Sequence, residues 1–405
     1  MKFFHHKYAF SASFCYLNYF LYGMAYIILA QNMAFLSRQF HVDSTDISFL
    51  IAIFGFGRLC TVFVDGILVD RFGRKWIAIT GCLLMTIFLV GVPFSPTYQF
   101  AMFFAVFGGL SIGCLDTSTY PSLMEFFPEF AGTATVVLKL ILAFGSFVLP
   151  IVTVFCYHQG LFFGFPFFAI AVVFVVSAFA LSRAAFPNKD SAAVSAEAPP
   201  NIEFVQRPSL GIDGIALVII GFTAPGLLYV MGTWLPTYGQ QAIGMNLSDA
   251  LRLVSFSNIG AIVSVIVLTI LLAKDIRPVT FLFVYPILSF VATIGFMVSH
   301  TAIMAQIMAF LIGAFTAGIF QLCLTVVCQF FWNIKGKVTG AVDTATGIAQ
   351  AGIPFFTGII LRAGSIHSVF VFSLVINFIA IGSGLFVNYR YRKLLKPVPS
   401  VEIHS

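Results

Sequence analysis

Charged side chains are scarce in this sequence. Asp, Glu, Lys and Arg together make up 9% of the 405 residues, whereas soluble globular domains carry roughly 25%. Hydrophobic residues make up 60%, and the mean hydropathy is +1.01. So few charges cannot cover the surface of a soluble protein, and we expect a membrane protein surrounded by the lipid bilayer. The net charge of +6 then reflects membrane topology, and no nucleic-acid partner is expected.

Metal-binding, redox and catalytic motifs are also absent. The seven cysteines all fall in apolar segments and form no Cys-x-x-Cys pair, so neither a disulfide framework nor a metal site is expected. The seven histidines lie near the termini or the ends of apolar segments. The sequence contains no Gly-rich phosphate loop of the ATPase type, which argues against ATP as the energy source. We therefore expect no enzyme activity, no cofactor and no bound metal.

What the sequence does contain is a series of long apolar segments. A membrane-spanning helix needs about 20 apolar residues, and twelve segments are long enough. They predict an all-α membrane protein with twelve transmembrane helices, at about 9–37, 45–69, 76–94, 98–125, 131–156, 161–183, 212–238, 248–273, 278–299, 301–331, 335–361 and 365–389.

The basic residues predict the orientation of these helices. Of the 21 Lys and Arg residues, two lie inside apolar segments. If the N-terminus is inside, sixteen of the others lie at the inner ends, and only Arg38, Arg252 and Arg362 lie at the outer ends. Because cytoplasmic loops carry the excess of Lys and Arg, we expect both termini to be cytoplasmic.

The two halves of the chain resemble each other. A polar stretch at 187–210, rich in Ala, Ser and Pro, is typical of a flexible linker. It separates an N-terminal six-helix bundle (1–186) from a C-terminal one (211–396), with a tail at 397–405. At an offset of 204 residues, Gly132 matches Gly336, Thr135 matches Thr339 and Pro150 matches Pro354. This offset also places Lys139 opposite Asp343.

The stretch Gly66–Lys75 (GILVDRFGRK) separates the second and third apolar segments. Gly66 allows close helix packing, and Gly73 permits a turn that a side chain would resist. The charged residues between them must lie at a membrane surface, so we expect a tight, charged turn. The stretch resembles the signature loop of the major facilitator superfamily, with every fixed position present: Gly66, Leu68, Asp70, Arg71, Gly73, Arg74 and Lys75.

This resemblance implies a transporter with two pseudo-symmetric six-helix bundles that move around a midplane site. The segments Leu115–Pro128 and Ala30–Met33 resemble a little-characterised bacterial branch of the family. They imply a multi-pass protein of the bacterial cytoplasmic (inner) membrane, and we expect it to act as a monomer.

Ionisable residues inside membrane helices are costly and therefore functional candidates. At 1.5 Å per residue, Asp116 and Lys139 lie at similar depths on neighbouring helices, so we expect them to form an ion pair or share a network. By the family fold, the helices of Arg58 and Asp343 are neighbours, and Arg58 has its nearest acid in the other half. Asp65 lies about one turn from the signature loop. An alternative is that such pairs only hold helices together.

The functional interpretation is that Arg58 and Lys139 attract an anionic substrate. Asp116 or Asp343 would then exchange its partner or carry a proton, because a carboxylate in a low dielectric takes up a proton unless it is paired. In the family, helices 1, 4, 7 and 10 line the cavity. The candidate substrate-binding residues are Arg58, Asp116, Lys139, Tyr120, Asn32, Gln31, Tyr22 and Gln321.

The resemblance also implies a cytoplasmic gate. An arginine of the signature loop would meet Glu125 or Glu129 at the inner end of the fourth helix. Asp70 would cap the helix that begins near residues 335–338, where the helix dipole favours an anion. These contacts would hold the outward-open state. The candidate gate residues are Gly66, Asp70, Arg71, Gly73, Arg74, Glu125 and Glu129.

Together these features predict a secondary active transporter of a small organic solute, an anionic organic acid taken up with protons. The first alternative is proton-coupled efflux of drugs or metabolites. The fourth helix carries Asp116 rather than the Arg that family exporters often have, which favours uptake. An alternative from another class is a membrane sensor or receptor on the same fold, and a weaker one is a lipid flippase.

Overall fold

The computed structural model describes residues 7–127, 131–186, 208–272, 277–331 and 334–394. Within these ranges the chain is almost entirely helical, and twelve helical segments are long and apolar enough to cross a membrane. The N-terminal half contains α1 (Ala9–Gln31), α2 (Met33–Phe40), α3 (Ser44–Phe72), α4 (Arg74–Phe94), α5 (Tyr98–Phe126), α6 (Ala131–His158) and α7 (Phe165–Arg183). The C-terminal half contains α8 (Ile215–Gln241), α9 (Leu247–Leu272), α10 (Pro278–Met297), α11 (Ala302–Thr316), α12 (Ile319–Phe330), α13 (Lys335–Ala363) and α14 (Ile366–Leu394).

The prediction of twelve membrane-spanning helices is confirmed, but two of the predicted segments are broken. The first ends as α1 at Gln31, and α2 begins at Met33, because Asn32 leaves the helical conformation. The tenth is interrupted at Gly318, whose φ of +87° is a conformation that glycine tolerates best. Apolar periodicity runs through both breaks, so it cannot reveal them.

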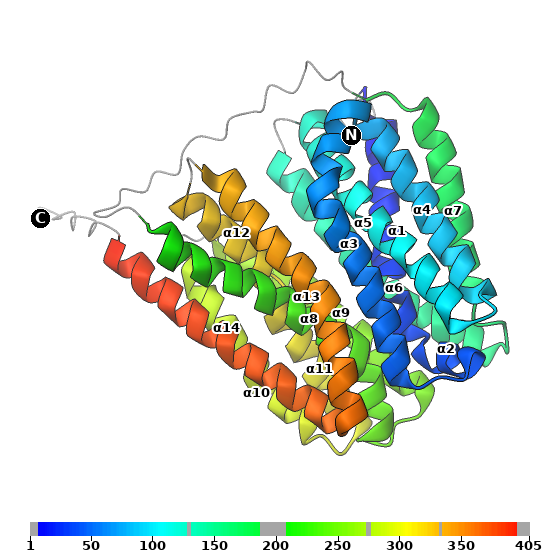
Figure 1. Ribbon diagram of the computed structural model, residues 1–405. Helices are drawn as coiled ribbons and strands as arrows, with labels where there is room; N and C mark the ends of the chain where they lie inside the picture. Colours follow the sequence, from blue (N-terminus) through cyan, green and yellow to red (C-terminus); the bar gives the residue numbers. More distant parts are fainter. Residues whose placement is uncertain (1–6, 128–130, 187–207, 273–276, 332–333, 395–405) are drawn as a thin grey trace, which may run out of the picture.

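The helices form two bundles, α1–α7 and α8–α14 (Figure 1). The beginning of α1 and the end of α14 lie on the same side, which we call the terminal side; the other is the distal side. In Figure 1 the bundles lie together at the distal side and diverge towards the terminal side. The two bundles therefore make their close contacts away from the chain ends.

Close contact at the distal side depends on glycines in α3 and α13. A Cβ atom at Gly55 would overlap the backbone carbonyl of Gln350, and one at Gly358 would overlap Oγ of Ser48. Without side chains at these positions, the backbones of the two bundles approach each other directly. The interface between the halves is thus tight along the distal part of α3.

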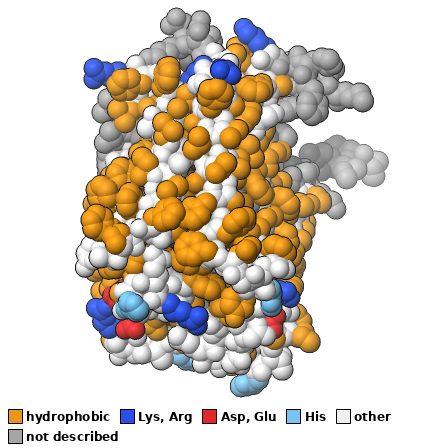
Figure 2. Space-filling model, turned by 90° about the vertical axis from the view of Figure 1, so that its right-hand side faces the viewer, with side chains coloured by type: hydrophobic (Ala, Val, Ile, Leu, Met, Phe, Trp, Pro, Cys, Tyr) orange, Lys and Arg blue, Asp and Glu red, His pale blue; other side chains and the backbone are white. Residues whose placement is uncertain are grey.

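The outward-facing surface of the bundles is apolar across its middle. Figure 2 shows hydrophobic side chains covering the central band, with charged side chains at the rims. On α7, Val172, Val176 and Phe179 are exposed, and on α4 Leu83 and Val90 are exposed. Such a broad apolar surface matches the hydrocarbon core of a bilayer, and it accounts for the composition.

The internal repeat proposed from the sequence coincides with equivalent helices. α6 begins at Ala131 and α13 at Lys335, an offset of 335 − 131 = 204. Each helix contains a proline, Pro150 and Pro354, at matching positions. Lys139 and Asp343 therefore occupy the same position in the two halves. The predicted linker (187–210) and tail (397–405) fall largely or wholly outside the described residues.

An ion pair joins the two halves at the distal side. Nη2 of Arg362, at the end of α13, lies 2.7 Å from Oδ1 of Asp46, at the start of α3. Arg362 also lies over the ring of Phe49 at 5.5 Å, and the backbone carbonyl of Asp46 accepts a hydrogen bond from Tyr98. Because the pair joins α3 to α13, it exists only while the distal side is closed.

We predict that Arg362→Ala shifts the protein towards states that are open at the distal side. The arginine side chain is 61% exposed, so the pair contributes only about 0.2–1 kcal/mol and the shift in populations is a few-fold. Pulsed electron paramagnetic resonance between spin labels at the distal ends of α3 and α13 measures it. Arg252→Ala, an exposed arginine of α9, is the control. Equal distance distributions in both variants would rule out a latch.

Candidate functional site

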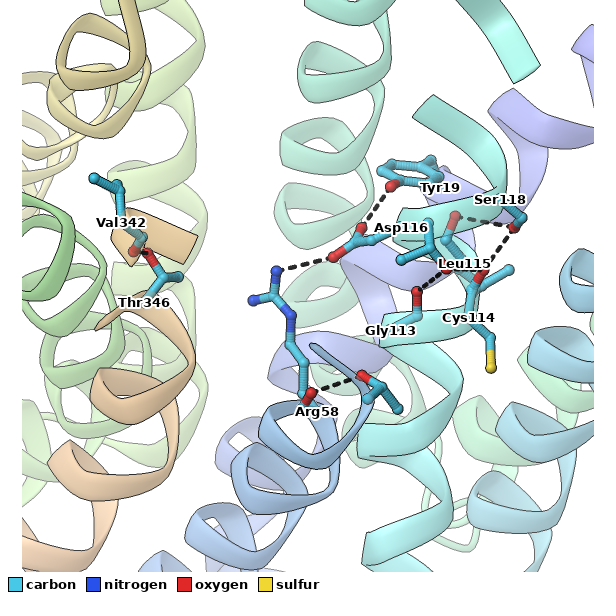
Figure 3. A network of polar contacts seen from close by, with 11 residues as sticks. Tyr19, Arg58, Gly113, Cys114, Leu115, Asp116, Ser118, Val342 and Thr346 are labelled. Atoms are coloured by element: carbon cyan, nitrogen blue, oxygen red, sulfur yellow. Dashed lines mark hydrogen bonds and ion pairs between the residues drawn. The ribbon is translucent and has the colours of Figure 1, made fainter. Parts of the chain in front are cut away.

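The centre of the candidate site is an ion pair within the N-terminal half. Nη2 of Arg58 in α3 lies 2.9 Å from Oδ2 of Asp116 in α5. The other carboxylate oxygen of Asp116 accepts a hydrogen bond of 2.5 Å from the hydroxyl of Tyr19 in α1 (Figure 3). The Arg58 and Asp116 side chains are 23% and 19% exposed, so the pair is neither sealed in the core nor open to bulk solvent. Three helices thus hold one carboxylate.

Arg58 and Asp116 meet because α3 and α5 pack through glycines. A Cβ atom at Gly57 would overlap the carbonyl oxygen of Val106, and one at Gly109 would overlap that of Phe54. This close crossing brings the long guanidinium arm of Arg58 within reach of α5. The expectation that the nearest acid to Arg58 lies in the other half is therefore wrong.

For Asp116 and Lys139 we expected an ion pair or a shared network, and the structure shows the network, because Arg58 takes the ion-pair position. The Nζ of Lys139 lies 5.1 Å from the ring centroid of Tyr120 in α5, a cation–π arrangement. Lys139 still interacts electrostatically with Asp116 and Arg58, so it belongs to the same network. Its side chain is exposed, and it has no ion-pair partner among the residues that the structure describes.

The C-terminal half contributes an acid to the same region. Asp343 in α13 is exposed and interacts electrostatically with Arg58, Asp116 and Lys139. It forms no ion pair within the described part of the chain. Figure 3 shows α13, with Val342 and Thr346, across from the guanidinium group of Arg58. We call Arg58, Asp116, Lys139 and Asp343 the charged cluster. Exposed charges that interact across the two halves at mid-helix depth indicate an accessible space between the bundles.

A series of tyrosines runs from the charged cluster to the C-terminal half. Tyr19 packs edge-on against Tyr120 (centroids 5.6 Å apart) and Tyr22 (5.3 Å), and Tyr22 packs against Tyr26 (6.0 Å). Tyr26 then contacts Tyr229 of α8 at 5.1 Å. This tyrosine ladder supplies aromatic faces and hydroxyl groups beside the charges.

Two residues of the tyrosine ladder were not predicted from the sequence. Tyr22 and Tyr120 were predicted, but Tyr19 and Tyr26 were not. The signal was available, because positions 19, 22 and 26 recur at helical spacing and share one face of α1. A single tyrosine in a membrane helix usually packs or anchors, so only the repetition marks this face.

The other predicted lining residues, Gln321, Gln31 and Asn32, differ in burial and in position. Gln321 of α12 is exposed. Gln31, at the end of α1, is buried, and neither amide atom has a hydrogen-bond partner among the described residues. Asn32 lies apart from the charged cluster: its amide donates to the carbonyl of Ile28, and it lines a separate cavity of about 180 Å³ with Phe35 and Thr153. Asn32 therefore ends α1 rather than contributing to the central site.

At the terminal side, the predicted charged turn is even tighter than expected. α3 ends at Phe72 and α4 begins at Arg74, with only Gly73 between them at a φ of +84°. Arg74 forms an ion pair with Glu125 at the end of α5, one of the predicted combinations. Arg71 is exposed. Asp65, Gly66 and Asp70 lie in α3, where the structure describes their backbone alone, and Glu129 lies outside the described residues.

The charged cluster combines side chains of both bundles. No group of three or more His, Cys, Asp or Glu that could hold a metal occurs among the described residues. The members of the cluster come from opposite bundles and interact electrostatically with one another. Such a geometry suits a solute that both halves contact in turn.

The comparisons with known proteins agree with this architecture. A model of the Major Facilitator Superfamily matches residues 15–351. The chain belongs to this family. The family consists of membrane transporters and not of enzymes, so this chain is a multi-pass transporter of a small molecule.

Two relatives cover nearly the whole transporter. It is 38% identical over 384 residues to the uncharacterized MFS-type transporter YfkL of Bacillus subtilis (strain 168). The matched region covers 95% of this chain and 97% of YfkL. This chain is 29% identical over 381 residues to the inner membrane transport protein YdiN of Escherichia coli (strain K12), spanning 94% and 90%. The likeness to YdiN, together with the twelve apolar helices, supports a multi-pass inner-membrane protein.

Among solved structures, the transporter resembles a D-xylose–proton symporter. The TM-score is 0.75 at 16% sequence identity, with 94% of this chain and 97% of the symporter covered. At this identity the likeness establishes the shared fold of two six-helix bundles.

Proposed function

We propose that this transporter takes up a small anionic organic acid together with protons. The observation that carries the proposal is Lys139, an exposed cation at mid-depth that lacks an ion-pair partner among the described residues. A cation without an ion-pair partner inside a membrane protein is costly, and a substrate carboxylate would compensate it. The neighbouring Arg58 adds positive potential when Asp116 changes its partner.

The proton would be carried by a carboxylate of the charged cluster. Arg58 and Lys139 balance Asp116 and Asp343, so the described cluster is neutral overall. An incoming monoanion makes it negative, and protonation of one carboxylate restores neutrality. Asp343 and Asp116 are the candidates, and a proton then accompanies each substrate.

Alternating access would expose the cluster to each side in turn. We propose that both termini are cytoplasmic, which follows from the sixteen basic residues at the inner ends, and that the protein acts as a monomer. The tight distal interface and the Asp46–Arg362 pair then correspond to a closed outer side. The Arg74–Glu125 pair and Asp70 belong to the inner side.

A ligand screen on purified protein tests this proposal. We expect organic acids to raise the unfolding temperature, because a ligand that binds the folded state stabilises it, and neutral sugars and cationic dyes to leave it unchanged. In proteoliposomes, a stabilising acid added outside is expected to alkalinise the medium.

Lys139→Gln is expected to remove the stabilisation by acids and to reduce uptake at least tenfold, an effect of roughly 1.4 kcal/mol. Lys393→Gln, an exposed lysine at the end of α14, is the matched control. Stabilisation by neutral sugars or cations alone would overturn the substrate class. Uptake without any pH change would overturn the coupling ion.

A further inference from the structure

The number of uncompensated cations at the site limits the charge of the substrate. The N-terminal half presents two cations, Arg58 and Lys139. Arg58 is neutralised by Asp116 at 2.9 Å, and Asp116 is fixed in this position by the hydroxyl of Tyr19. Lys139 lies over the ring of Tyr120 and has no ion pair among the described residues. While Asp116 remains paired with Arg58, one positive charge, that of Lys139, is therefore available to a ligand.

The opposite wall of the site carries a negative charge. Asp343 on α13 is exposed and interacts electrostatically with both cations, but it has no ion-pair partner in the described part of the chain. A ligand with its carboxylate at Lys139 directs its other end towards α13. While Asp343 is ionised, a second carboxylate there would meet its like charge, which disfavours binding.

Neutral polar groups continue from these charges along the site. Gln350 lies seven positions after Asp343, two turns along the same face of α13. Its Oε1 atom has no hydrogen-bond partner among the described residues, and the residue is buried. The ladder residues Tyr26 and Tyr229 come together from the two halves. An amide oxygen and phenol hydroxyls suit hydroxyl groups on the body of a ligand.

We infer that the site selects hydroxylated monocarboxylates over dicarboxylates, and that Asp116 sets this selectivity by neutralising Arg58. This inference rests on the proposed transport of organic acids and narrows it. Asp116 is thus a specificity determinant. Its carboxylate neutralises Arg58, so that only one of the two cations can bind a carboxylate of the substrate.

Three compounds with the same six-carbon skeleton provide the test: glucitol with no carboxylate, gluconate with one and glucarate with two. Thermal stabilisation of the purified wild-type protein, titrated over millimolar concentrations, gives the apparent affinity for each. A matched aromatic set (benzyl alcohol, 4-hydroxybenzoate and phthalate) covers a ligand with a ring. We expect the monocarboxylate to bind at least about tenfold more tightly than its dicarboxylate in one of the sets.

Asp116→Asn removes the charge that neutralises Arg58 while keeping one acceptor oxygen for its guanidinium group, and the new amide N–H can donate to the hydroxyl of Tyr19. With two free cations, the preference is expected to move at least about tenfold towards the dicarboxylate of the same set. Asp249→Asn, at the start of α9, makes the same chemical change away from the cluster and is expected to keep the wild-type preference.

The outcomes separate the two proposals. Equal or tighter binding of the dicarboxylate to the wild-type protein would overturn the selectivity while leaving transport of organic acids standing. So would an unchanged preference in folded Asp116→Asn protein. Stabilisation by glucitol or benzyl alcohol alone would overturn both proposals, and so would no stabilisation by any monocarboxylate. The wild-type comparison decides the inference even if Asp116→Asn does not fold.

Discussion

Arg58→Ala is expected to reduce transport more than tenfold and to destabilise the protein. The substitution leaves the carboxylate of Asp116, 19% exposed, with the hydroxyl of Tyr19 as its remaining partner. Removing one member of a fully buried pair costs about 3–5 kcal/mol, and this pair is partly accessible, so we expect about 2 kcal/mol. Uptake in cells and the unfolding temperature of the purified protein measure the two effects separately.

A double variant distinguishes a transport role from a purely structural one. Arg58→Gln combined with Asp116→Asn removes both charges and leaves groups of similar size that can still form hydrogen bonds. If the pair only holds α3 against α5, this variant recovers both stability and uptake. If Arg58 attracts the substrate, it recovers the unfolding temperature and still fails to transport. Arg58→Lys, which keeps the charge, is expected to retain partial uptake.

The membrane architecture was predictable because hydrocarbon imposes a simple rule. Every backbone polar group must be satisfied within the membrane, so an apolar segment of about 20 residues becomes a helix. This is why the apolar segments predict all twelve membrane-spanning helices. The breaks at Asn32 and Gly318 were not predictable in the same way, because they depend on local backbone conformation inside continuous apolar sequence.

The composition of the charged cluster was also predictable, because each of its members is an ionisable residue inside an apolar segment. Which residues pair was not. Helical depth placed Asp116 level with Lys139, but depth ignores how far apart two helix axes lie. The glycine contacts at Gly57 and Gly109 bring α3 close to α5. Asp116 therefore forms its ion pair with Arg58. Helix proximity of this kind is a tertiary property that one sequence does not display.

Asp213 shows a different limit of the sequence argument. It lies in the short π-helix at Leu210–Gly214, beside the predicted linker, and it was not counted among the membrane-embedded charges. In the structure its side chain is fully buried. Arg390, at the end of α14, donates to both carboxylate oxygens, at 2.7 Å and 2.9 Å, and the backbone N–H of Ser209 donates a third hydrogen bond. An acid near a linker can thus be a core residue.

Arg390→Ala is accordingly expected to destabilise the C-terminal half strongly. The fully buried carboxylate of Asp213 would retain only the hydrogen bond from Ser209, and removing one partner of a buried ion pair costs about 3–5 kcal/mol. Thermal unfolding of the purified protein in detergent measures the loss. Arg392→Ala, an exposed arginine two positions away, is the control and is expected to change stability little.

Arg390→Lys separates geometry from charge in the same experiment. A lysine keeps the positive charge but cannot make the two parallel hydrogen bonds of a guanidinium group, so we expect an intermediate loss of stability. Because the pair joins the π-helix that precedes α8 to α14 within one bundle, uptake per folded molecule is expected to remain near the wild-type value. Equal unfolding temperatures for Arg390→Ala and Arg392→Ala would contradict a stabilising role. Normal stability with lost uptake would instead place Asp213 in the transport mechanism.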